Sequence, residues 1–416
     1  MGRKENETKL VLKLNGRGGQ LKMDEKGENL FLLSGGKIIK LNIKSVDKPS
    51  RKNISFAAEM ELNAQAERDY IFNHAWKQVS DKFYAPDFKG VDWKMYKDAY
   101  KEFLPSINNN YDFADLLGEM LGELNGSHTG GRYSHRSNGD ETASLGAFFD
   151  LSYQGKGLKI AEIIEKGPLD KSDLDISVGD VIEQINGEDI LNEVNYFKIL
   201  NHVDGKNTQL RIYHPTQLKT SIVVIKPITQ RRKSSLLYDR WVKFMREETD
   251  RLSEGKVGYV HIRGMNDASF RVAYSEILGR NVDKESIIVD TRFNGGGWLH
   301  DDLVTLLSGE RYVDFAPRGK YVGSAPMEKW YRPSVVLMGE GNYSDAHAFP
   351  YAYKALKIGK LVGMPVPGTM TAVWWERQID PSLVFGIPQM GVWDLDGNYL
   401  ENQQLEPDFK VAQDKE

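Results

Sequence analysis

Residues 286–302 read SIIVDTRFNGGGWLHDD, and this stretch decides how the second half of the chain is organised. An apolar run typical of a buried strand ends at Asn294, three glycines follow, and a helical pattern begins after them. Outward from this point, strand and helix patterns alternate over residues 256–363. This alternation predicts an α/β core with at least partly parallel strands.

The remaining sequence predicts three further parts. Short strands with a Gly35-Gly36 turn indicate hairpins near the start, the first strand being LVLKL at residues 10–14. A helical stripe of Ile71, Phe72, Ala75, Trp76 and Val79 follows. The expected division is a β fragment over 1–54, a helical domain over 55–135, a β-rich domain over 144–228 and the core over 236–416, which begins with a helix over 238–252.

Composition excludes several classes of function. The net charge is −4, from 55 basic and 59 acidic residues, so we expect neither nucleic-acid nor membrane binding. The short basic run at residues 230–233 is interpreted as a solvated linker. No cysteine is present and no HExxH spacing occurs, so we expect no disulfide, no cysteine nucleophile, no metal and no cofactor. The N-terminus lacks an apolar signal region, which predicts a cytoplasmic protein, or a periplasmic one if a signal peptide has been removed.

A candidate nucleophile lies in VLMGEGNYSDAHAF, residues 336–349. Ser344 follows an apolar strand and a Gly-containing turn, directly before a helix. A serine at such a turn exposes its hydroxyl beside backbone N–H groups, and the N–H of Asp345 would then stabilise an oxyanion. The alternative is that Ser344 is only a helix N-cap.

The glycine turn at residues 294–297 allows three interpretations. It lacks the GxGxxG and GK[ST] spacings of phosphate loops, which disfavours a phosphate site. The other two are an oxyanion donor and a clamp for a peptide backbone opposite Ser344. Both turns follow parallel strands, whose carboxyl ends meet at one rim of a sheet.

A candidate general base lies in ELNGSHTGG, residues 123–131, where His128 is next to Ser127. A serine hydroxyl needs a base to react at neutral pH, although a histidine in such a loop is also commonly a surface residue. His300 and His347 have no comparably placed partner. With a histidine base, activity should rise with pH through a midpoint near ~6.5 unless the site shifts it.

A candidate acid lies in YLENQQLEPDF, residues 399–409. A carboxylate that orients the imidazole is the usual third member of a serine-hydrolase site. By composition alone either Glu401 or Glu406 fits this role, and each also fits an ordinary surface carboxylate.

These stretches together resemble the catalytic half of the tricorn protease family, which belongs with the C-terminal-processing peptidases among the serine peptidases. The resemblance spans residues 57–412. It is carried by motifs in a fixed order: FNHAWKQVSDKFYAPDFKGVDW, ELNGSHTGG, a PDZ-like unit with GDVIEQINGEDI, IIVDTRFNGGG, NYSDAHAF and LENQQLEPD. It implies a crotonase-like α/β core and a PDZ domain over residues 144–228, whose groove would take extended chains by strand addition.

The resemblance also implies site residues. For catalysis these are Ser344 as nucleophile, His128 as base, Ser127 as the bridge to Glu401, and the N–H groups of Asp345 and of Gly296 or Gly295 as oxyanion donors. For substrate binding they are Asn294 and Gly297 in the glycine turn, and Leu145, Gly146 and Phe148 in the carboxylate-binding loop LGAF. Ala346 departs from the glycine that the family pattern leads us to expect.

The expected function is that of a serine endopeptidase or oligopeptidase acting on unfolded peptides and proteins, and a homo-oligomeric assembly. Asp301, Asp302 and Asp314 are candidates for a pocket that takes a basic side chain. A Ser–Lys dyad is disfavoured, because Lys360 lies in the strand after the nucleophile's helix and the next lysine is Lys410. The alternative from another class is an inactive, peptide-binding PDZ scaffold.

Overall fold

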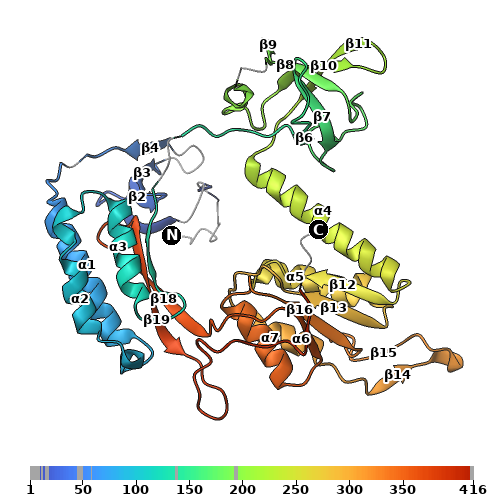
Figure 1. Cartoon of the computed structure of the whole chain (residues 1–416). Helices are drawn as coiled ribbons and strands as arrows, with labels where there is room; N and C mark the ends of the chain where they lie inside the picture. The colour runs from blue at the N-terminus through green and yellow to red at the C-terminus, as the bar shows by residue number, and fades with distance from the viewer. Residues whose placement is uncertain are drawn as a thin grey trace, which may run out of the picture. The chain divides into compact units, whose positions relative to one another are not determined.

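A computed structural model of the chain contains two compact units, residues 1–67 and 68–416, which are described separately (Figure 1). The residues that it describes are 10, 13–14, 18–44, 50–57, 59–135, 139–191 and 195–412.

The N-terminal unit is an antiparallel sheet in the order β1-β2-β3-β4. Its strands are β1 (Gly18–Met23), β2 (Asn29–Ser34), β3 (Lys37–Asn42) and β4 (Ser50–Ile54). The predicted hairpin is confirmed, since Ser34 pairs with Lys37 and the intervening Gly35 and Gly36 have φ of 58° and 72°. These left-handed angles suit glycine. The predicted strand at residues 10–14 lies partly outside the described residues.

The helical region consists of α1 (Ala64–Lys82), α2 (Trp93–Lys101) and α3 (Asn110–Gly122). The predicted stripe on α1 faces the core, with Ile71 and Phe72 fully buried and Trp76 partly buried. Side chains cap two helices: Asp92 accepts from the first turn of α2, and Asn109 does so for α3. Such caps satisfy backbone N–H groups that lack a partner inside the helix.

Two strands from the C-terminal third complete this helical region. β18 (Thr371–Arg377) and β19 (Leu383–Gly391) pair with β5 (Gly130–Tyr133) in an antiparallel sheet, order β18-β19-β5. Phe385 of β19 is fully buried in the same core as the helices. The expected boundaries at residues 135 and 236 therefore do not separate two hydrophobic cores. β18 and β19, which lie within the predicted 236–416 domain, pack with the helical region.

The β-rich domain is a sheet in the order β11-β10-β8-β7-β6, with β9 on β8. Its strands are β6 (Ala147–Phe149), β7 (Leu158–Ile163), β8 (Val181–Ile185), β9 (Glu188–Asp189), β10 (Thr208–His214) and β11 (Lys219–Ile225). β6 pairs on one side only and is therefore an edge strand, with an unpaired row of backbone groups.

Helix α4 (Gln230–Leu252) follows the β-rich domain and packs on β12 of the core. The prediction of a linker over residues 230–233 is wrong, because these residues form the first turn of α4. Thr229 caps this turn by accepting from the N–H of Arg232 at 3.1 Å. A side-chain cap of this kind favours helix over an extended linker, whereas Arg231 and Arg232 are exposed, as expected, and Lys233 is half-buried.

The α/β core contains a parallel sheet in the order β12-β13-β16-β17-β20, which confirms the predicted α/β class (Figure 1). Its strands are β12 (Val257–His261), β13 (Ser286–Asp290), β16 (Ser334–Met338), β17 (Lys360–Gly363) and β20 (Phe409–Lys410). Helices α5 (Asp267–Ser275), α6 (His300–Leu307) and α7 (Asp345–Ala355) pack against it in one core. β13 and β16 are neighbours, so the turns that follow them lie at the same rim.

A short hairpin, β14 (Val313–Phe315) and β15 (Gly323–Ala325), projects from the core between α6 and β16. Within the described residues, no helix is both long enough and apolar enough to cross a membrane.

Candidate active site

Ser344 lies at a tight turn between β16 and α7, with φ 56° and ψ −122°. This backbone conformation is unfavourable for any residue with a side chain, and such strain is typical of serine nucleophile turns. Ser344 occupies the N-cap position, but its side chain makes no capping hydrogen bond. Its own N–H donates to Oγ1 of Thr369 at 2.9 Å. The hydroxyl is therefore not consumed by helix capping.

The glycine turn packs directly against Ser344, as expected for two turns at one rim. A Cβ placed on Gly296 would lie 2.7 Å from Cβ of Ser344, 2.6 Å from the carbonyl oxygen of Tyr343 and 3.1 Å from the backbone nitrogen of Asp345. The φ of Gly296 is 94°. Contact distance and backbone angle both demand glycine at this position.

The backbone N–H groups at this contact differ in whether they already donate a hydrogen bond. The N–H of Gly296 donates to Oδ1 of Asn294 at 2.9 Å, so it is already used. In the described part of the chain, no hydrogen bond is found for the N–H groups of Asp345 and Gly295. Of the two glycines named from the sequence, Gly295 therefore has the free donor.

Asn294 holds the glycine turn in place. It is fully buried, its Nδ2 donates to the carbonyl of Ile262 at 2.8 Å, and its own carbonyl accepts from the N–H of Tyr343 at 3.0 Å. With both ends of the amide bonded to backbone, its side chain supports the turn and is not exposed to a substrate. Gly297 forms a parallel bridge with Met265, and a Cβ on it would lie 1.9 Å from the carbonyl oxygen of Met265.

Asp345 ties the first turns of α6 and α7 together. Its buried carboxylate accepts from the N–H groups of Leu299 (2.5 Å) and His300 (3.1 Å) and contacts Nδ1 of His300 at 2.5 Å. This hydrogen bond raises the pKa of His300. His300 is therefore a partner of Asp345 and not of Ser344.

His128 lies in the loop between α3 and β5 and approaches the Ser344 turn through Tyr343. Its N–H donates to Oη of Tyr343 at 2.7 Å, and the two ring centroids are 4.8 Å apart. Strand β19 passes close to its backbone, because a Cβ on Gly386 would lie 2.1 Å from the carbonyl oxygen of His128. His128, which is 8% exposed, is thus held against Tyr343, the residue before Ser344, and within the described residues no hydrogen bond joins its imidazole to Ser344.

The other side of the imidazole faces Ser127, Thr371 and Glu401. Nδ1 of His128 lies 2.8 Å from Oγ of Ser127 and 3.0 Å from Oγ1 of Thr371. The Glu401 carboxylate accepts from both the N–H of Ser127 (2.5 Å) and its hydroxyl (3.0 Å). Segments more than 200 residues apart in sequence are brought together here.

Of the two candidate acids, Glu401 lies in this cluster and Glu406 does not. Glu401 is only 3% exposed, whereas Glu406 is exposed and its carbonyl accepts from Nζ of Lys354. Burial raises the pKa of Glu401, and the hydrogen bonds from Ser127 oppose this shift.

The electrostatic setting keeps His128 neutral near pH 7. Burial, together with the positive charge of Arg132, lowers its pKa to about 4. An unprotonated imidazole is the form that can accept a proton. The midpoint near ~6.5 expected from the sequence is therefore shifted down by the surroundings.

The other candidates lie away from this cluster. His347 is buried inside α7, its Nδ1 accepts from the N–H of Thr369 at 3.2 Å, and burial lowers its pKa to about 4. Lys360 is exposed on β17 and pairs with Asp408 at 3.3 Å. Ala346 is fully buried in the core, with its N–H bonded to the carbonyl of Tyr343.

Sequence reasoning missed Thr369, Thr371 and Tyr343. Thr369 supports the Ser344 turn, Thr371 contacts His128, and Tyr343 lies between Ser344 and His128. A signal for the threonines exists in retrospect, since Gly368-Thr-Met-Thr places two hydroxyls at i and i+2, on the same side of an extended chain.

The β-rich domain has a groove of about 650 Å³ between β6 and the helical turn η3 (Tyr196–Leu200). Phe148 lines it together with Tyr196 and Phe197. Leu145 is 2% exposed and belongs to the domain core, and Gly146 has φ 76° and lies against Pro168. Part of the predicted loop therefore borders the groove, with Phe148 as an apolar lining residue, whereas Gly146 does not line it.

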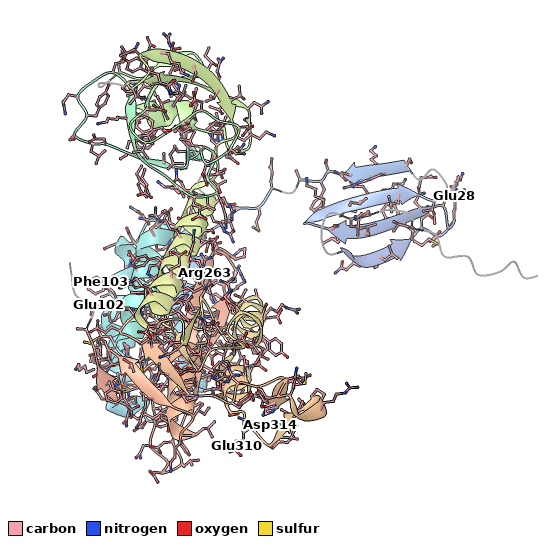
Figure 2. All side chains as sticks on the ribbon, turned by 90° about the vertical axis from the view of Figure 1, so that its right-hand side faces the viewer. Glu28, Glu102, Phe103, Arg263, Glu310 and Asp314 are labelled. Carbon is pink, nitrogen blue, oxygen red and sulfur yellow. The ribbon has the colours of Figure 1, made fainter. Side chains whose placement is uncertain are left out.

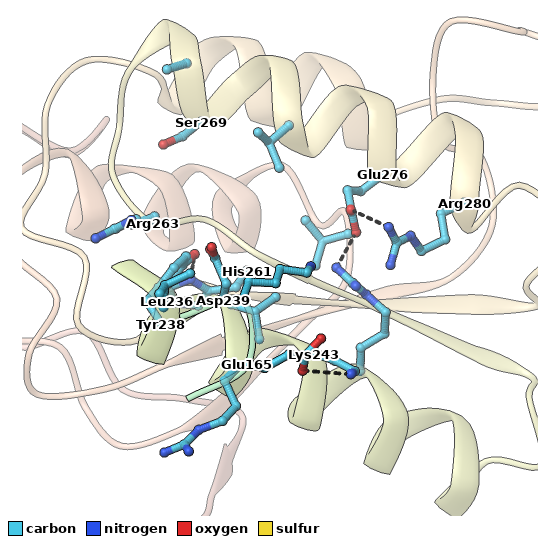
Figure 3. A pocket seen from close by; sticks show the side chains of 17 residues that line it. Glu165, Leu236, Tyr238, Asp239, Lys243, His261, Arg263, Ser269, Glu276 and Arg280 are labelled. Carbon is cyan, nitrogen blue, oxygen red and sulfur yellow. Dashed lines mark hydrogen bonds and ion pairs between the residues drawn. The ribbon is translucent and has the colours of Figure 1, made fainter. Parts of the chain in front are cut away.

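A second cavity, of about 530 Å³, lies between α4 and α5 near the end of β12 (Figure 3). Its lining includes His261, Arg263 and Glu276, and Glu276 pairs with Arg246 at 2.8 Å and Arg280 at 3.2 Å. None of the residues named for catalysis lines it, so its size does not mark the reactive centre.

The acidic residues near the glycine turn have separate surroundings. Asp314 lies on the β14–β15 hairpin, labelled in Figure 2, where it accepts from Arg311 and from Ser324, both at 2.7 Å. The side chain of Asp301 is exposed, and Asp302 is exposed on the first turn of α6. The described residues include no cluster of three or more histidine, aspartate or glutamate side chains that could hold a metal ion.

Comparisons with known proteins match consecutive parts of the chain. The tricorn protease C1 domain matches residues 64–122, the tricorn protease PDZ domain residues 145–230, and peptidase family S41 residues 256–411. A putative tricorn-like protease C-terminal subunit from Sulfurisphaera tokodaii is 28% identical over 374 residues, covering 85% of this chain and 42% of that protein. The tricorn protease of Thermoplasma acidophilum is 24% identical over 354 residues, covering 82% of this chain and 32% of that protein.

The fold is also similar to a solved structure. The crystal structure of the tricorn protease aligns with a TM-score of 0.80 at 21% identity, covering 94% of this chain and 39% of that one. The chain thus spans less than half the length of these relatives.

Proposed function

The chain belongs to the tricorn protease-like serine peptidases of family S41, and from this premise we propose that it hydrolyses peptide bonds with Ser344 as nucleophile and His128 as base. Ser127 and Glu401 orient the His128 imidazole from its Nδ1 side. The observation that carries the proposal is the contact chain from the Glu401 carboxylate through the Ser127 hydroxyl to Nδ1 of His128.

The direction of each proton in this chain follows from what the groups can donate. An ionised carboxylate can only accept a hydrogen bond, so the Ser127 hydroxyl uses its one O–H to donate a hydrogen bond to Glu401. Its oxygen then has only lone pairs for the ring, which favours a proton on Nδ1 of His128. The lone pair of Nε2 is thereby left free to act as the base.

The reaction then proceeds by acyl transfer. Nε2 of His128 takes the hydroxyl proton as Oγ of Ser344 bonds to the substrate carbonyl carbon, and the carbonyl π electrons move onto its oxygen. When this intermediate collapses, the C–N bond breaks and the imidazolium gives its proton to the leaving amine. Water, activated by the same imidazole, then hydrolyses the acyl-enzyme and regenerates Ser344.

The oxyanion is held by backbone donors. The N–H of Asp345, at the first turn of α7, is one, and its position at a helix N-terminus adds a favourable dipole. The free N–H of Gly295 is the second donor, since that of Gly296 is bonded to Asn294. Gly296 contributes by allowing the two turns to approach.

The substrate class is unfolded peptide. The PDZ groove beside β6 supports this, because an edge strand with an open groove suits addition of an extended chain. Phe148, Tyr196 and Phe197 give the groove apolar contacts for alternate side chains of such a chain.

Labelling with a fluorophosphonate probe tests the function directly. A hydroxyl activated by His128 should attack the phosphorus, giving its proton to the imidazole and displacing fluoride, and so form a stable adduct on Ser344 that is detectable as a mass increase on the peptide containing residues 341–349. The His128→Ala variant is the control and should label far more slowly. Folded wild-type protein that fails to label would overturn the proposal and leave the alternative of a peptide-binding PDZ scaffold.

Activity should be lost at acid pH and constant around neutrality. His128 must be neutral and Glu401 ionised, so kcat/KM is fully present above the higher of their pKa values and falls as pH drops through it. Burial lowers the first pKa to about 4 and raises the second. We expect kcat/KM to be flat from about pH 6.5 to 8 and to fall only below it. An acid midpoint at or above about 6.5, with the fold intact by circular dichroism, would contradict this assignment.

A further inference from the structure

Thr371 contacts both members of the Ser127–His128 pair. It is the first residue of β18 and 5% exposed. Its Oγ1 lies 2.9 Å from Oγ of Ser127 and 3.0 Å from Nδ1 of His128, and it also reaches the carbonyl of Ser127 at 3.4 Å. Two hydroxyl oxygens, and not one, therefore face Nδ1.

The Thr371 hydroxyl has one hydrogen to donate and lone pairs that can accept, and its neighbours decide how each is used. The Ser127 hydroxyl donates to Glu401, which leaves its oxygen as an acceptor. The Thr371 hydroxyl can donate to the oxygen or the carbonyl of Ser127, and its own oxygen is then also free to accept. Both oxygens consequently accept from Nδ1–H, and a proton on Nδ1 is the arrangement that satisfies every group.

We infer that Thr371 is a positioning residue for His128. Its hydroxyl is a second acceptor for Nδ1–H, which holds the base in its reactive tautomer and stabilises the imidazolium that forms during the reaction. This inference rests on the proposed function and adds a residue that acts through His128 without touching the substrate.

Burial makes this acceptor important. The His128 side chain is largely removed from water, and Arg132 adds an unfavourable positive charge when the ring is protonated. In such surroundings each hydrogen bond to the charged ring contributes more than it would in water. A second oxygen at 3.0 Å offsets part of the cost of forming the imidazolium.

The strand itself does not need this hydroxyl. Thr371 pairs with Gly391 through the backbone, and the next residues on the same side of β18 are Val373 and Trp375. A β-branched apolar residue such as valine would suit the buried start of the strand equally well. The hydroxyl is thus explained by its contacts with Ser127 and His128, not by strand formation.

Thr371→Val removes the hydroxyl while keeping the shape. We expect kcat to fall about 10- to 100-fold with KM changed less than about twofold, because the missing hydrogen bond matters most when the ring becomes charged, as the imidazolium forms. Thr371→Ser restores an oxygen and should recover most of kcat. Thr220→Val, the same exchange on exposed strand β11, is the control and should leave kcat unchanged.

Ser127→Ala combined with Thr371→Val gives an independent test. Each hydroxyl can accept from Nδ1–H when the other is removed, so the double variant should lose more activity than the product of the two single losses. Normal kcat in Thr371→Val, a Thr371→Ser variant as poor as Thr371→Val, or a double loss no greater than the product would each overturn the inference. If Thr371→Val does not fold, Thr371→Ala carries the same expectation.

Ser344→Ala, measured in the same assay, separates this inference from the proposed function. If hydrolysis persists in Ser344→Ala, the proposed function itself is wrong. If hydrolysis requires Ser344 but is indifferent to the Thr371 hydroxyl, only the role of Thr371 is wrong.

Discussion

Ser344→Ala is expected to abolish peptide hydrolysis while leaving the fold intact. The substitution removes the atom that forms the acyl-enzyme, and losses of this kind amount to about 10⁴- to 10⁶-fold in rate. Stability should be almost unchanged, because the Ser344 side chain makes no capping hydrogen bond. The measurement is kcat/KM on an unfolded peptide substrate, together with the thermal unfolding midpoint.

Two further variants sharpen this result. Ser344→Gly should be equally inactive but more stable than wild type by about 1 kcal/mol or more, because glycine adopts φ 56° without the strain of a side chain. Ser308→Ala, at an exposed serine after α6, is the matched control and should keep full activity. Near-normal turnover by purified Ser344→Ala would rule out Ser344 as nucleophile.

Glu401→Gln is expected to lower kcat about 10²- to 10⁴-fold with little change in KM. The amide can donate as well as accept, so the Ser127 hydroxyl is no longer forced to donate its hydrogen bond to residue 401. The reactive tautomer of His128 is then no longer favoured. It also lacks the negative charge that stabilises the imidazolium. Because the carboxylate is buried, no water replaces it, and the loss should persist at high ionic strength.

Glu406→Gln provides the matched control five residues away. Its side chain is exposed, so the substitution should be close to silent. Ser127→Ala should cost less than Glu401→Gln, because Thr371 still accepts from Nδ1–H. The pair Ser127→Ala and Glu401→Gln act in series on one imidazole, so their combined loss should be smaller than the product. A greater loss from Glu406→Gln than from Glu401→Gln would refute the assignment.

Local patterns in the sequence were sufficient for the main elements of the fold. Apolar runs, glycine turns and helical periodicity depend on neighbouring residues, so they predicted the parallel core and the Gly35-Gly36 hairpin correctly. The expectation that two turns share one rim was also correct, because it follows from strand direction alone. The linker predicted over residues 230–233 is wrong, because Thr229 caps a helix that begins there and the basic side chains do not prevent it.

Neighbouring residues with the same chemistry could not be told apart in this way. Glu401 and Glu406 are both glutamates near one turn, and only packing buries the first against Ser127, which is 274 residues away in sequence. Likewise, Gly295 and Gly296 differ only in that the N–H of Gly296 is bonded to Asn294. These differences depend on the position of a side chain from another segment.

Local sequence is enough to identify the side chains that acyl transfer needs and the turns that could expose them. The partners of each side chain depend on long-range pairing, because β18 and β19 lie outside the parallel sheet and β19 pairs with β5 beside the His128 loop. β18 in this sheet carries Thr371 to His128, and the chain that follows β19 places Glu401 against Ser127. Long-range pairing of this kind is set by the burial of complete strand faces, and no local pattern at residues 127, 371 or 401 contains it.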